Sequence, residues 1–448
     1  MSKKYDLTND SVVKIFIHYF IMSAAGLMVL SIHIILDGIF IGHGIGSDGL
    51  AAINIAGVVF PFLNAISFTI GFGAAAAVSV KFGEGESQKA NNIFNQAFML
   101  SIIVSLVYTV LSIIFIDQLV YLLGSNEQLF QGSKDYLFVF SLFSIFYIIT
   151  IVFENAVRND GEPKKAMISL ILGAVTNTVL NYVFIFIFSW GLKGAALATG
   201  IGQIVSCVYL TSHFLFQKGQ LYFQRTGFFK QDIIRIVRNG VPNGLSQLSV
   251  TLVIITGNWI VIDMLGELGV AAFGILIYIN EFVILGFAGV AGALQPLVSF
   301  NFGAKKKERI QKIVQLAFYA TLLIGITVII VSIKEADIII RLFNNEEELV
   351  SLTSHAMKLF FLGIVFTGLN MLYSAYFQAV EKAKESAIIQ VLRGFVFIFI
   401  ALFTLPKIYD VDGLWISPSI AEVLTFAISI ILVKTRPILK KNEVIKDN

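Results

Sequence analysis

Residues 51–80 read AAINIAGVVFPFLNAISFTIGFGAAAAVSV and contain no Asp, Glu, Lys or Arg. A helix needs about 20 apolar residues to cross a bilayer, so this stretch is long enough to cross one. Seven more stretches lack charge and four carry one charged residue each, which predicts twelve transmembrane helices. The uncharged stretches are 51–80, 93–116, 136–153, 166–192, 194–217, 239–262, 313–333 and 359–380, and the others are 15–41 with Asp37, 268–304 with Glu281, 386–406 with Arg393 and 413–433 with Glu422.

The composition agrees with a chain that lies in a membrane. Only 14% of its residues are charged and 57% are hydrophobic, whereas a soluble domain has about 25% charged residues. The apolar runs are continuous and do not alternate, so they predict helices and not barrel strands. The N-terminal MSKKYDLTND lacks the features of a signal peptide, so 15–41 is expected to be the first helix. The expected fold is an all-α integral membrane protein.

Several kinds of chemistry find no support in the sequence. Cys207 is the only cysteine, which excludes an internal disulfide and a cysteine-based metal cluster. A GxxxxGK[ST] loop, an HExxH motif and a Ser/His/Asp signature are all missing, so neither ATP-driven transport nor hydrolysis is indicated. The net charge of +3 is small, and no nucleic-acid partner is expected. We therefore expect a protein without enzymatic activity, cofactor or bound metal.

Lys and Arg are distributed unevenly over the loops. With the N-terminus in the cytoplasm and twelve crossings, 26 of the 32 fall on the cytoplasmic side. Positive residues concentrate in cytoplasmic loops, and an odd number of crossings would scramble this bias. Both termini are therefore predicted to be cytoplasmic. The residues left on the outer side are Lys134, Lys193, Lys334, Arg341, Lys358 and Lys407.

The two halves of the chain repeat each other at an offset of 220 residues. With an even number of helices per half, both repeats have the same orientation, which is a transporter architecture with its substrate site near the middle of the membrane. We expect an N-terminal six-helix bundle at 1–217, a cytoplasmic linker at 218–238 whose amphipathic end lies on the membrane surface, and a C-terminal six-helix bundle at 239–448. The matching residues are Gly49, Ala51, Ala52, Val78, Ser79, Phe82, Gly83, Ile93, Ala97 and Phe98, with Gly269, Ala271, Ala272, Val298, Ser299, Phe302, Gly303, Ile313, Ala317 and Phe318.

Several motifs recur at the right places in both halves. They are LDGIFIGHGIG (36–46), GEGESQKA (83–90), NDGEPKKAM (159–167), the NxxxN of Asn177 and Asn181, GVPNGLSQL (240–248), QPLVSFNFGAKK (295–306), FQAVEKAKESA (377–387) and LPKIYDVDGLWISPSIAE (405–422). With these motifs, nearly the whole chain resembles the multidrug and toxic compound extrusion (MATE) transporters. The resemblance implies a V-shaped pair of six-helix bundles that exports organic, often cationic compounds against an inward flux of protons or sodium ions.

One position departs from the pattern of that family. Many of its members carry an acid in the fifth helix where this chain has Asn181, so Asp37 is the only acid within the spans of the first half. The departure speaks against a cation site built from two carboxylates. It favours a site built from one acid and neighbouring amides.

Three acids within the spans are the first candidates for function. Asp37 lies in the outer half of the first span, Glu281 near the middle of the eighth, and Glu422 in the outer half of the twelfth. Ionisable residues in spanning helices are costly to insert and are functional candidates by default. The alternative is that each acid is an interior polar group bonded to an Asn, Ser or Tyr on a neighbouring helix. Arg393, placed near the cytoplasmic end of its span, is the only Lys or Arg inside one.

Three further residues are expected to act with Asp37 in ion coupling. His33 precedes Asp37 by four residues, so the two side chains share a helix face, which permits a direct pair or one bridging water. Histidine titrates near neutral pH, which suits a proton relay; the alternative is a neutral histidine bonded to a backbone carbonyl. Asn177 and Asn181 have the same spacing and present two amides to one cavity, unless they only hold helices together.

A larger set of polar residues is expected to line the substrate cavity. Side chains of this kind within spans either bind a substrate or join helices. Many of the 41 phenylalanines could add aromatic faces for flat cations, although most are expected to face lipid or pack between helices. The set is Asn64, Asn258, Asn280, Glu281, Asn370, Tyr373, Tyr376 and Glu422.

The interpretation that follows is a secondary multidrug antiporter without a cofactor, coupled to protons or to sodium. Its expected partners are small organic substrates and membrane lipid, and it is expected to be a monomer in a bacterial cytoplasmic membrane. One alternative is a flippase for lipid-linked sugars, which would need a strongly basic cavity, whereas only Arg393 lies inside a span. Another alternative, an intramembrane enzyme or receptor, would need a catalytic dyad or a sizeable soluble domain.

Overall fold

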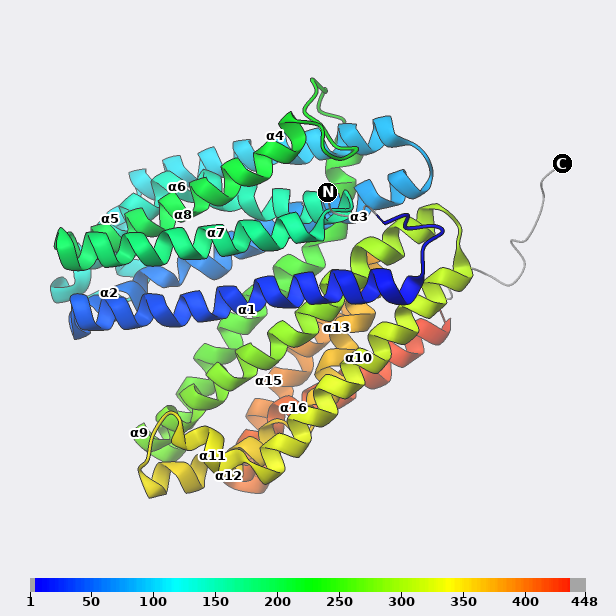
Figure 1. Cartoon of the computed structure of the whole chain (residues 1–448). Helices are drawn as coiled ribbons and strands as arrows, with labels where there is room; N and C mark the ends of the chain where they lie inside the picture. Colours follow the sequence, from blue (N-terminus) through cyan, green and yellow to red (C-terminus); the bar gives the residue numbers. More distant parts are fainter. Residues whose placement is uncertain (1–4, 436–448) are drawn as a thin grey trace. The chain divides into compact units, whose positions relative to one another are not determined.

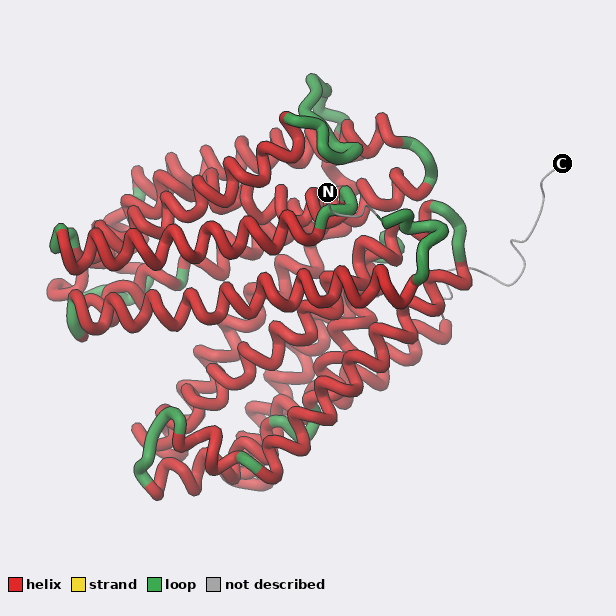
Figure 2. The backbone as a smooth tube through the Cα atoms, viewed as in Figure 1, coloured by secondary structure: helices red, strands yellow, loops and turns green. Residues whose placement is uncertain are grey.

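A computed structural model describes residues 5–435, and every secondary-structure element in this part of the chain is a helix (Figures 1 and 2). The terminal residues 1–4 and 436–448, which are expected to be cytoplasmic, lie outside the described residues. The long apolar stretches 51–80 and 313–333 fold as helices because the hydrocarbon core of a bilayer leaves backbone groups no other partners. The all-α membrane fold expected from the sequence is confirmed.

The described helices account for the expected crossings. Ten of them are long and apolar enough to cross a membrane, and there are eleven if the pair bent by 46°, α12 (Glu347–Phe360) with α13 (Ile364–Ala379), is counted as one span. Among the ten is α9 (Lys230–Gly303), whose 74 residues contain a break at Gly266. Gly266 has φ 63° and ψ −153°, a conformation that glycine adopts readily because it has no Cβ. The two parts of α9 are each long enough for one crossing, which is consistent with twelve.

The described chain divides into two compact units. Unit 1 contains residues 21–244, and unit 2 contains residues 7–20 and the chain from Leu245 onward. The helices of unit 1 are most of α1 (Val12–Gly44), α2 (Ser47–Gly57), α3 (Val59–Gly83), α4 (Ser87–Ile114), α5 (Ile116–Leu122), α6 (Glu127–Asn159), α7 (Pro163–Asn181), the π-helix η1 (Tyr182–Ile187), α8 (Gly191–Leu215) and the start of α9. Unit 2 holds the start of α1, the rest of α9, α10 (Lys307–Lys334), α11 (Ala336–Arg341), α12, α13, α14 (Ala383–Val391), the π-helix η2 (Leu392–Val396), α15 (Phe397–Thr404) and α16 (Pro406–Thr435).

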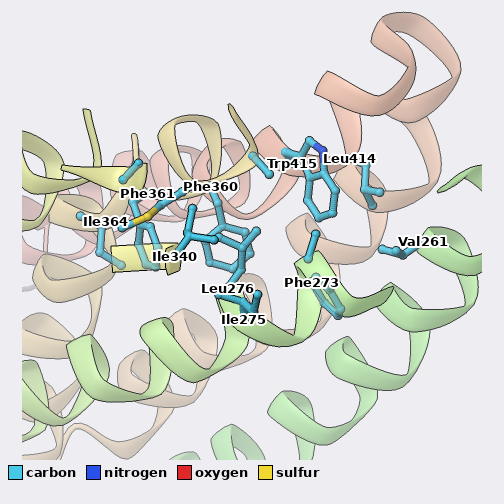
Figure 3. Packing of buried hydrophobic residues seen from close by; sticks show 14 of the residues in the cluster. Val261, Phe273, Ile275, Leu276, Ile340, Phe360, Phe361, Ile364, Leu414 and Trp415 are labelled. Carbon is cyan, nitrogen blue, oxygen red and sulfur yellow. The ribbon is translucent and has the colours of Figure 1, made fainter. Parts of the chain in front are cut away.

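Each unit has its own apolar core. In unit 1, Leu63, Leu137 and Phe140 are buried at 0–1% exposure, and the rings of Phe60 and Phe140 lie 4.5 Å apart. In unit 2 the core surrounds Trp415, which is 1% exposed and lies beside Phe273 (Figure 3). Aromatic and branched side chains fill these cores at high density, which fixes the helices that carry the polar residues described below.

The sequence repeat is also a repeat of tertiary contacts. In unit 1 the Ser79 hydroxyl donates to the side chain of Asn159 over 2.6 Å, and in unit 2 the Ser299 hydroxyl donates to the carbonyl oxygen of Ala379 over 2.8 Å. Both residues of the second bond lie 220 positions after those of the first. The two halves therefore share a helix–helix hydrogen bond at corresponding positions, as expected for an internal repeat.

The segment 218–238, expected as a linker, packs within unit 1. Its extended part follows α4, where Asn91 accepts from the backbone N–H of Tyr222 over 2.9 Å and donates to the carbonyl oxygen of Gln220 over 2.9 Å. Asn95, one turn later on α4, bonds Tyr222 and Gln224 in the same way. Two side-chain amides thus replace a neighbouring strand for this backbone. The expected position of the amphipathic end on the membrane surface stays a prediction.

Candidate functional site

Unit 1 contains a chain of polar side chains that joins three helices. Asn181 on α7 donates through Nδ2 to Oδ1 of Asp37 on α1, and the same nitrogen donates to Oδ1 of Asn177 over 2.8 Å. Asn177 in turn donates to the hydroxyl of Thr199 on α8 over 3.0 Å. Asp37, Asn177 and Asn181, which the sequence predicts to act together, lie together in the structure. Thr199 was not among the predicted residues, because its only signal was a hydroxyl within an apolar span.

Local backbone structure places these residues. Asn177 and Asn181 lie one turn apart near the end of α7, so they share one face of that helix. A Cβ at Gly202 on α8 would lie 2.9 Å from the carbonyl oxygen of Gly173 on α7, so α7 and α8 approach closely only because glycine is there. Directly after Asn181 the chain winds into η1, and π-helices are rare elements that recur at functional sites.

The amides of this chain are deeply buried, and one of their atoms is left over. Asn177 is 2% and Asn181 0% exposed. Because Asn181 Nδ2 serves both Asp37 and Asn177, its carbonyl oxygen Oδ1 remains, buried and without a hydrogen-bond partner in the part of the chain that the structure describes. Buried polar atoms are normally bonded. An unpaired amide oxygen beside a carboxylate is suited to receive a proton donor or a cation.

His33 does not join this group. Its Nδ1 is buried and has no hydrogen-bond partner among the described residues, and neither ring nitrogen is bonded to Asp37 there, so the direct pair that the spacing permits is not formed. Spacing along the helix put both residues on one face, but the Asp37 carboxylate turns toward α7, where Asn181 supplies a donor. The i,i+4 rule states which side chains can meet, whereas rotamers and neighbouring helices decide which do meet.

Unit 2 contains a second polar cluster around Glu422 on α16. Arg393 in η2 donates to Oε1 of Glu422 through Nη2 over 2.6 Å and through Nε over 3.1 Å. Asn370 on α13 donates to the other oxygen, Oε2, over 2.7 Å, and to the backbone carbonyl of Glu422 over 2.9 Å. The Arg393 and Glu422 side chains are 14% and 13% exposed. This is an ion pair largely withdrawn from solvent, held by a neutral amide.

The pair corrects two expectations. Arg393 was placed near the cytoplasmic end of its span and Glu422 in the outer half of another, but bonded residues lie at the same level. The limits of an apolar stretch give its length and not the depth of each residue, because tilt and packing set the depth. Arg393 was also left out of the expected site. The sequence signal that could have indicated this ion pair is the single Arg and the single Glu in two consecutive apolar spans.

The remaining candidates are scattered. Tyr373 lies beside Phe426, with ring centroids 6.2 Å apart, close to the Glu422 cluster. Asn64 accepts a 2.7 Å hydrogen bond from Tyr147, apart from the Asp37 chain. The others form no hydrogen bond or ion pair within the described part of the chain, and they are Asn258, Asn280, Glu281 and Tyr376.

Glu281 and Glu422, which the sequence put in one expected cavity, have different surroundings. The Glu281 side chain is exposed and has no ion pair among the described residues, whereas Glu422 is bonded on both carboxylate oxygens. The expectation that an acid in a span is satisfied by an Asn, Ser or Tyr therefore fits Glu422 in part, since Asn370 serves one oxygen and Arg393 the other.

Solved structures share this fold over almost the whole chain. A MATE transporter in complex with MaL6 has a TM-score of 0.92 at 22% identity and covers 97% of this chain and 98% of its own. An outward-facing multidrug resistance transporter of the MATE family has a TM-score of 0.91 at 23% identity with the same coverage. A MOP superfamily transporter from Pyrococcus furiosus, described by the reverse polarity of its binding pocket, has a TM-score of 0.90 at 23% identity, again over 97% and 98%.

Sequence comparison gives the same result. The chain is similar to the multidrug export protein MepA of Staphylococcus saprophyticus, with 24% identity over 436 residues, which are 96% of this chain and 95% of that protein. MepA of Staphylococcus aureus is 22% identical over 431 residues, with 96% and 95% covered. The family model described as MatE matches residues 23–183 and 242–403. Because these matches fill most of both halves, the chain belongs to the MatE family of multi-pass membrane proteins, as its motifs indicated.

Proposed function

We propose that this protein is a secondary multidrug efflux transporter that exports small organic compounds, often cations, in exchange for protons that move inward. The observation that carries the proposal is the hydrogen-bonded chain of Asp37, Asn181, Asn177 and Thr199. The relatives named multidrug export proteins span the same length and support the substrate class. The proposed activity is transport and not catalysis, and it requires no cofactor.

The carboxylate of Asp37 is the proposed coupling site. It faces a neutral amide, and no ion pair to it is formed within the described residues, so its negative charge is free to attract a proton or a cation. When Asp37 is charged, it accepts from Asn181 Nδ2. When it is protonated, the carboxylic acid becomes a donor, and the unpaired Oδ1 of Asn181 is the adjacent acceptor.

The gain of a donor gives the proton a way to act on the helices. The hydroxyl of protonated Asp37 can donate to Asn181 Oδ1 while Nδ2 still donates to the other carboxyl oxygen, so protonation removes the charge and adds a second hydrogen bond between α1 and α7. The rest of the chain then rearranges through Asn177 and Thr199, and α1, α7 and α8 repack. Proton and cationic drug thus favour different helix arrangements, and linkage makes their antagonism reciprocal. Alternating access of the two six-helix halves, 1–217 and 239–448, follows from this exchange.

The cellular setting is part of the proposal. We place the protein in a bacterial cytoplasmic membrane as a monomer surrounded by lipid, with both termini in the cytoplasm. The bias of Lys and Arg toward one set of loops supports this orientation. The flippase alternative gains no support from Arg393, because Glu422 neutralises it and the cluster carries no net positive charge.

Efflux from proteoliposomes tests the proposal. Wild-type protein is expected to move a fluorescent cation against its gradient when a proton gradient is imposed and to stop when an ionophore collapses that gradient. Asp37→Asn has the shape of the protonated state and lacks the charge, so it is expected to abolish this movement while the protein remains folded. Efflux that follows a sodium gradient and ignores pH would assign sodium as the coupling ion. An Asp37→Asn protein with the wild-type rate and pH dependence would remove Asp37 from the mechanism.

A further inference from the structure

The ion pair of unit 2 uses only part of the hydrogen-bonding capacity of Arg393. Both of its bonds to Glu422, from Nε and from Nη2, end on the same oxygen, Oε1. A guanidinium has five N–H donors in a planar fork, so Nη1 and one hydrogen of Nη2 have no partner in the described part of the chain. The usual two-oxygen fork of an Arg–carboxylate pair is not formed, because Asn370 takes the second oxygen.

Glu422 is held in place without Arg393. Asn370, which is 0% exposed, donates to Oε2 and to the backbone carbonyl of Glu422, and Asn370 itself accepts from the Ser429 hydroxyl over 2.9 Å. In unit 1 the hydroxyl of Thr150, 220 positions before Asn370, donates to the carbonyl oxygen of Gln203, 219 positions before Glu422. A similar contact therefore joins the same two helices in unit 1, where a glutamine takes the place of the acid. Arg393 is therefore the partner that can turn toward a ligand while Glu422 stays.

The charge balance of the pair restricts what can bind. A ligand with one charge would compete with one member of the pair and leave the other poorly compensated, which is strongly unfavourable in a site of low dielectric. A ligand with one positive and one negative group avoids this cost. Its anion takes the free donors of Arg393, and its cation faces Glu422, so every charge keeps an opposite neighbour.

Aromatic rings flank the acid. Phe426 follows Glu422 by one turn on α16, and its ring lies 6.2 Å from Tyr373 and 5.1 Å from Phe366, measured between centroids. Tyr373 in turn follows Asn370 by three residues on α13, so amide, acid and rings face the same region between α13 and α16. The faces of aromatic rings attract delocalised cations. A flat aromatic cation therefore fits beside Glu422 better than a compact ammonium ion does.

We propose that Arg393 and Glu422 form a second binding site, in unit 2, for flat aromatic zwitterions, with the ligand carboxylate on Arg393 and the cationic ring system beside Glu422 and Phe426. This site is separate from the Asp37 chain, which has a single acid and no base. Arg393 lies in η2, so each unit carries its polar cluster at a π-helix of corresponding helices. The inference names a substrate class for the proposed transporter and rests on its binding of organic compounds, but not on the coupling ion.

Two dyes that differ in one group test the site. Rhodamine 19 carries a free carboxylate on a cationic xanthene, and rhodamine 6G is its ethyl ester, which is a cation only. Equilibrium binding to the purified full-length protein is measured by fluorescence polarisation with no gradient present, so a failure of ion coupling does not affect the result. The variants are Arg393→Gln, Arg393→Lys and, as a control, Lys358→Gln, which removes an exposed positive charge on α12.

The expected result is a selective loss. Arg393→Gln should weaken the binding of rhodamine 19 about tenfold or more, as the loss of a charged hydrogen bond does, and leave the affinity for rhodamine 6G unchanged or higher. Arg393→Lys keeps the charge without the fork and should fall in between, while Lys358→Gln should match the wild type with both dyes. Size-exclusion chromatography and thermal unfolding check that each variant is folded.

Three results would overturn the proposal. In the first, a folded Arg393→Gln protein binds both dyes more weakly by the same factor. In the second, the substitution changes the affinity for neither dye. In the third, the wild type binds the ester more tightly than rhodamine 19, and Arg393→Gln leaves the ratio of the two affinities unchanged. If Arg393→Gln does not yield monodisperse protein, Arg393→Lys decides between the same outcomes.

Discussion

Asp37 and Glu422 are both acids in apolar helices, yet their nearest neighbours give them different properties. Asp37 is bonded to a neutral amide, whereas Glu422 is bonded to a guanidinium and an amide. A charge without a counter-charge in a low-dielectric site binds protons or cations strongly. A charge that is already paired does so weakly. The same residue class therefore has a coupling role in one unit and a recognition role in the other under our proposals.

Thr199 is predicted to matter for function although three hydrogen bonds separate it from Asp37. Thr199→Val preserves the shape of the side chain but leaves the buried Nδ2 of Asn177 without its acceptor. We expect a loss of about 1 kcal/mol of stability and a slower gradient-driven efflux. Both are measured on purified protein, by thermal unfolding in detergent and by proteoliposome transport.

The matched control is on the same helix. The Thr211 hydroxyl on α8 donates to the carbonyl oxygen of Cys207, one turn earlier in the same helix. Thr211→Val therefore leaves no side chain of another helix without its hydrogen-bond acceptor. It should leave efflux at the wild-type rate. If the two valine variants transport equally well at equal amounts of protein, the link from Asn177 to Thr199 has no functional importance.

At the scale of elements, the contact between α7 and α8 decides whether the polar chain can form. A Cβ at Gly202 would lie 2.9 Å from the backbone oxygen of Gly173, a distance that requires the two helices to move apart. Gly202→Ala should therefore cost about 1–3 kcal/mol of stability, as overpacking does. It should also weaken transport, because Asn177 and Thr199 lie on these two helices.

A second helical glycine provides the comparison. A Cβ at Gly274 in α9 would meet no atom within 4 Å, so Gly274→Ala should be neutral or stabilising by up to about 1 kcal/mol through helix propensity. Thermal unfolding of both variants in detergent separates the two cases. A Gly202→Ala protein that melts at or above the temperature of Gly274→Ala would show that α7 and α8 do not need this close approach.

At the scale of the whole molecule, the distribution of Lys and Arg over the loops predicts the orientation in the membrane. We expect a membrane-impermeant maleimide to label Lys193→Cys on intact cells and Lys306→Cys only after permeabilisation, in a background where Cys207 is replaced by serine. Lys193 and Lys306 are exposed in the structure, so access of the reagent reflects the side of the membrane. Labelling of both positions from outside would contradict the number of crossings between them, and the reversed pattern would contradict the orientation.

The sequence alone determined the number and type of the spans, the repeat and the family. A bilayer forces every apolar stretch of this length into a helix, because the backbone has no water to bond there. Such a constraint acts locally, so it can be followed along the chain without knowledge of any other segment. The 220-residue offset likewise needed only the order of residues, and the bonds of Ser79 and Ser299 repeat it in space.

Only the tertiary structure decided which polar residues meet. Asp37 turned to Asn181 and not to His33, one turn away, and Arg393 met Glu422 although their spans suggested different depths. These pairings depend on the rotation, tilt and depth of each helix, which are set by packing against other helices and by single close approaches such as that at Gly202. The hydrophobicity pattern along a chain contains little information about rotation, tilt and depth, since turning a spanning helix about its axis does not change how many apolar residues it contains.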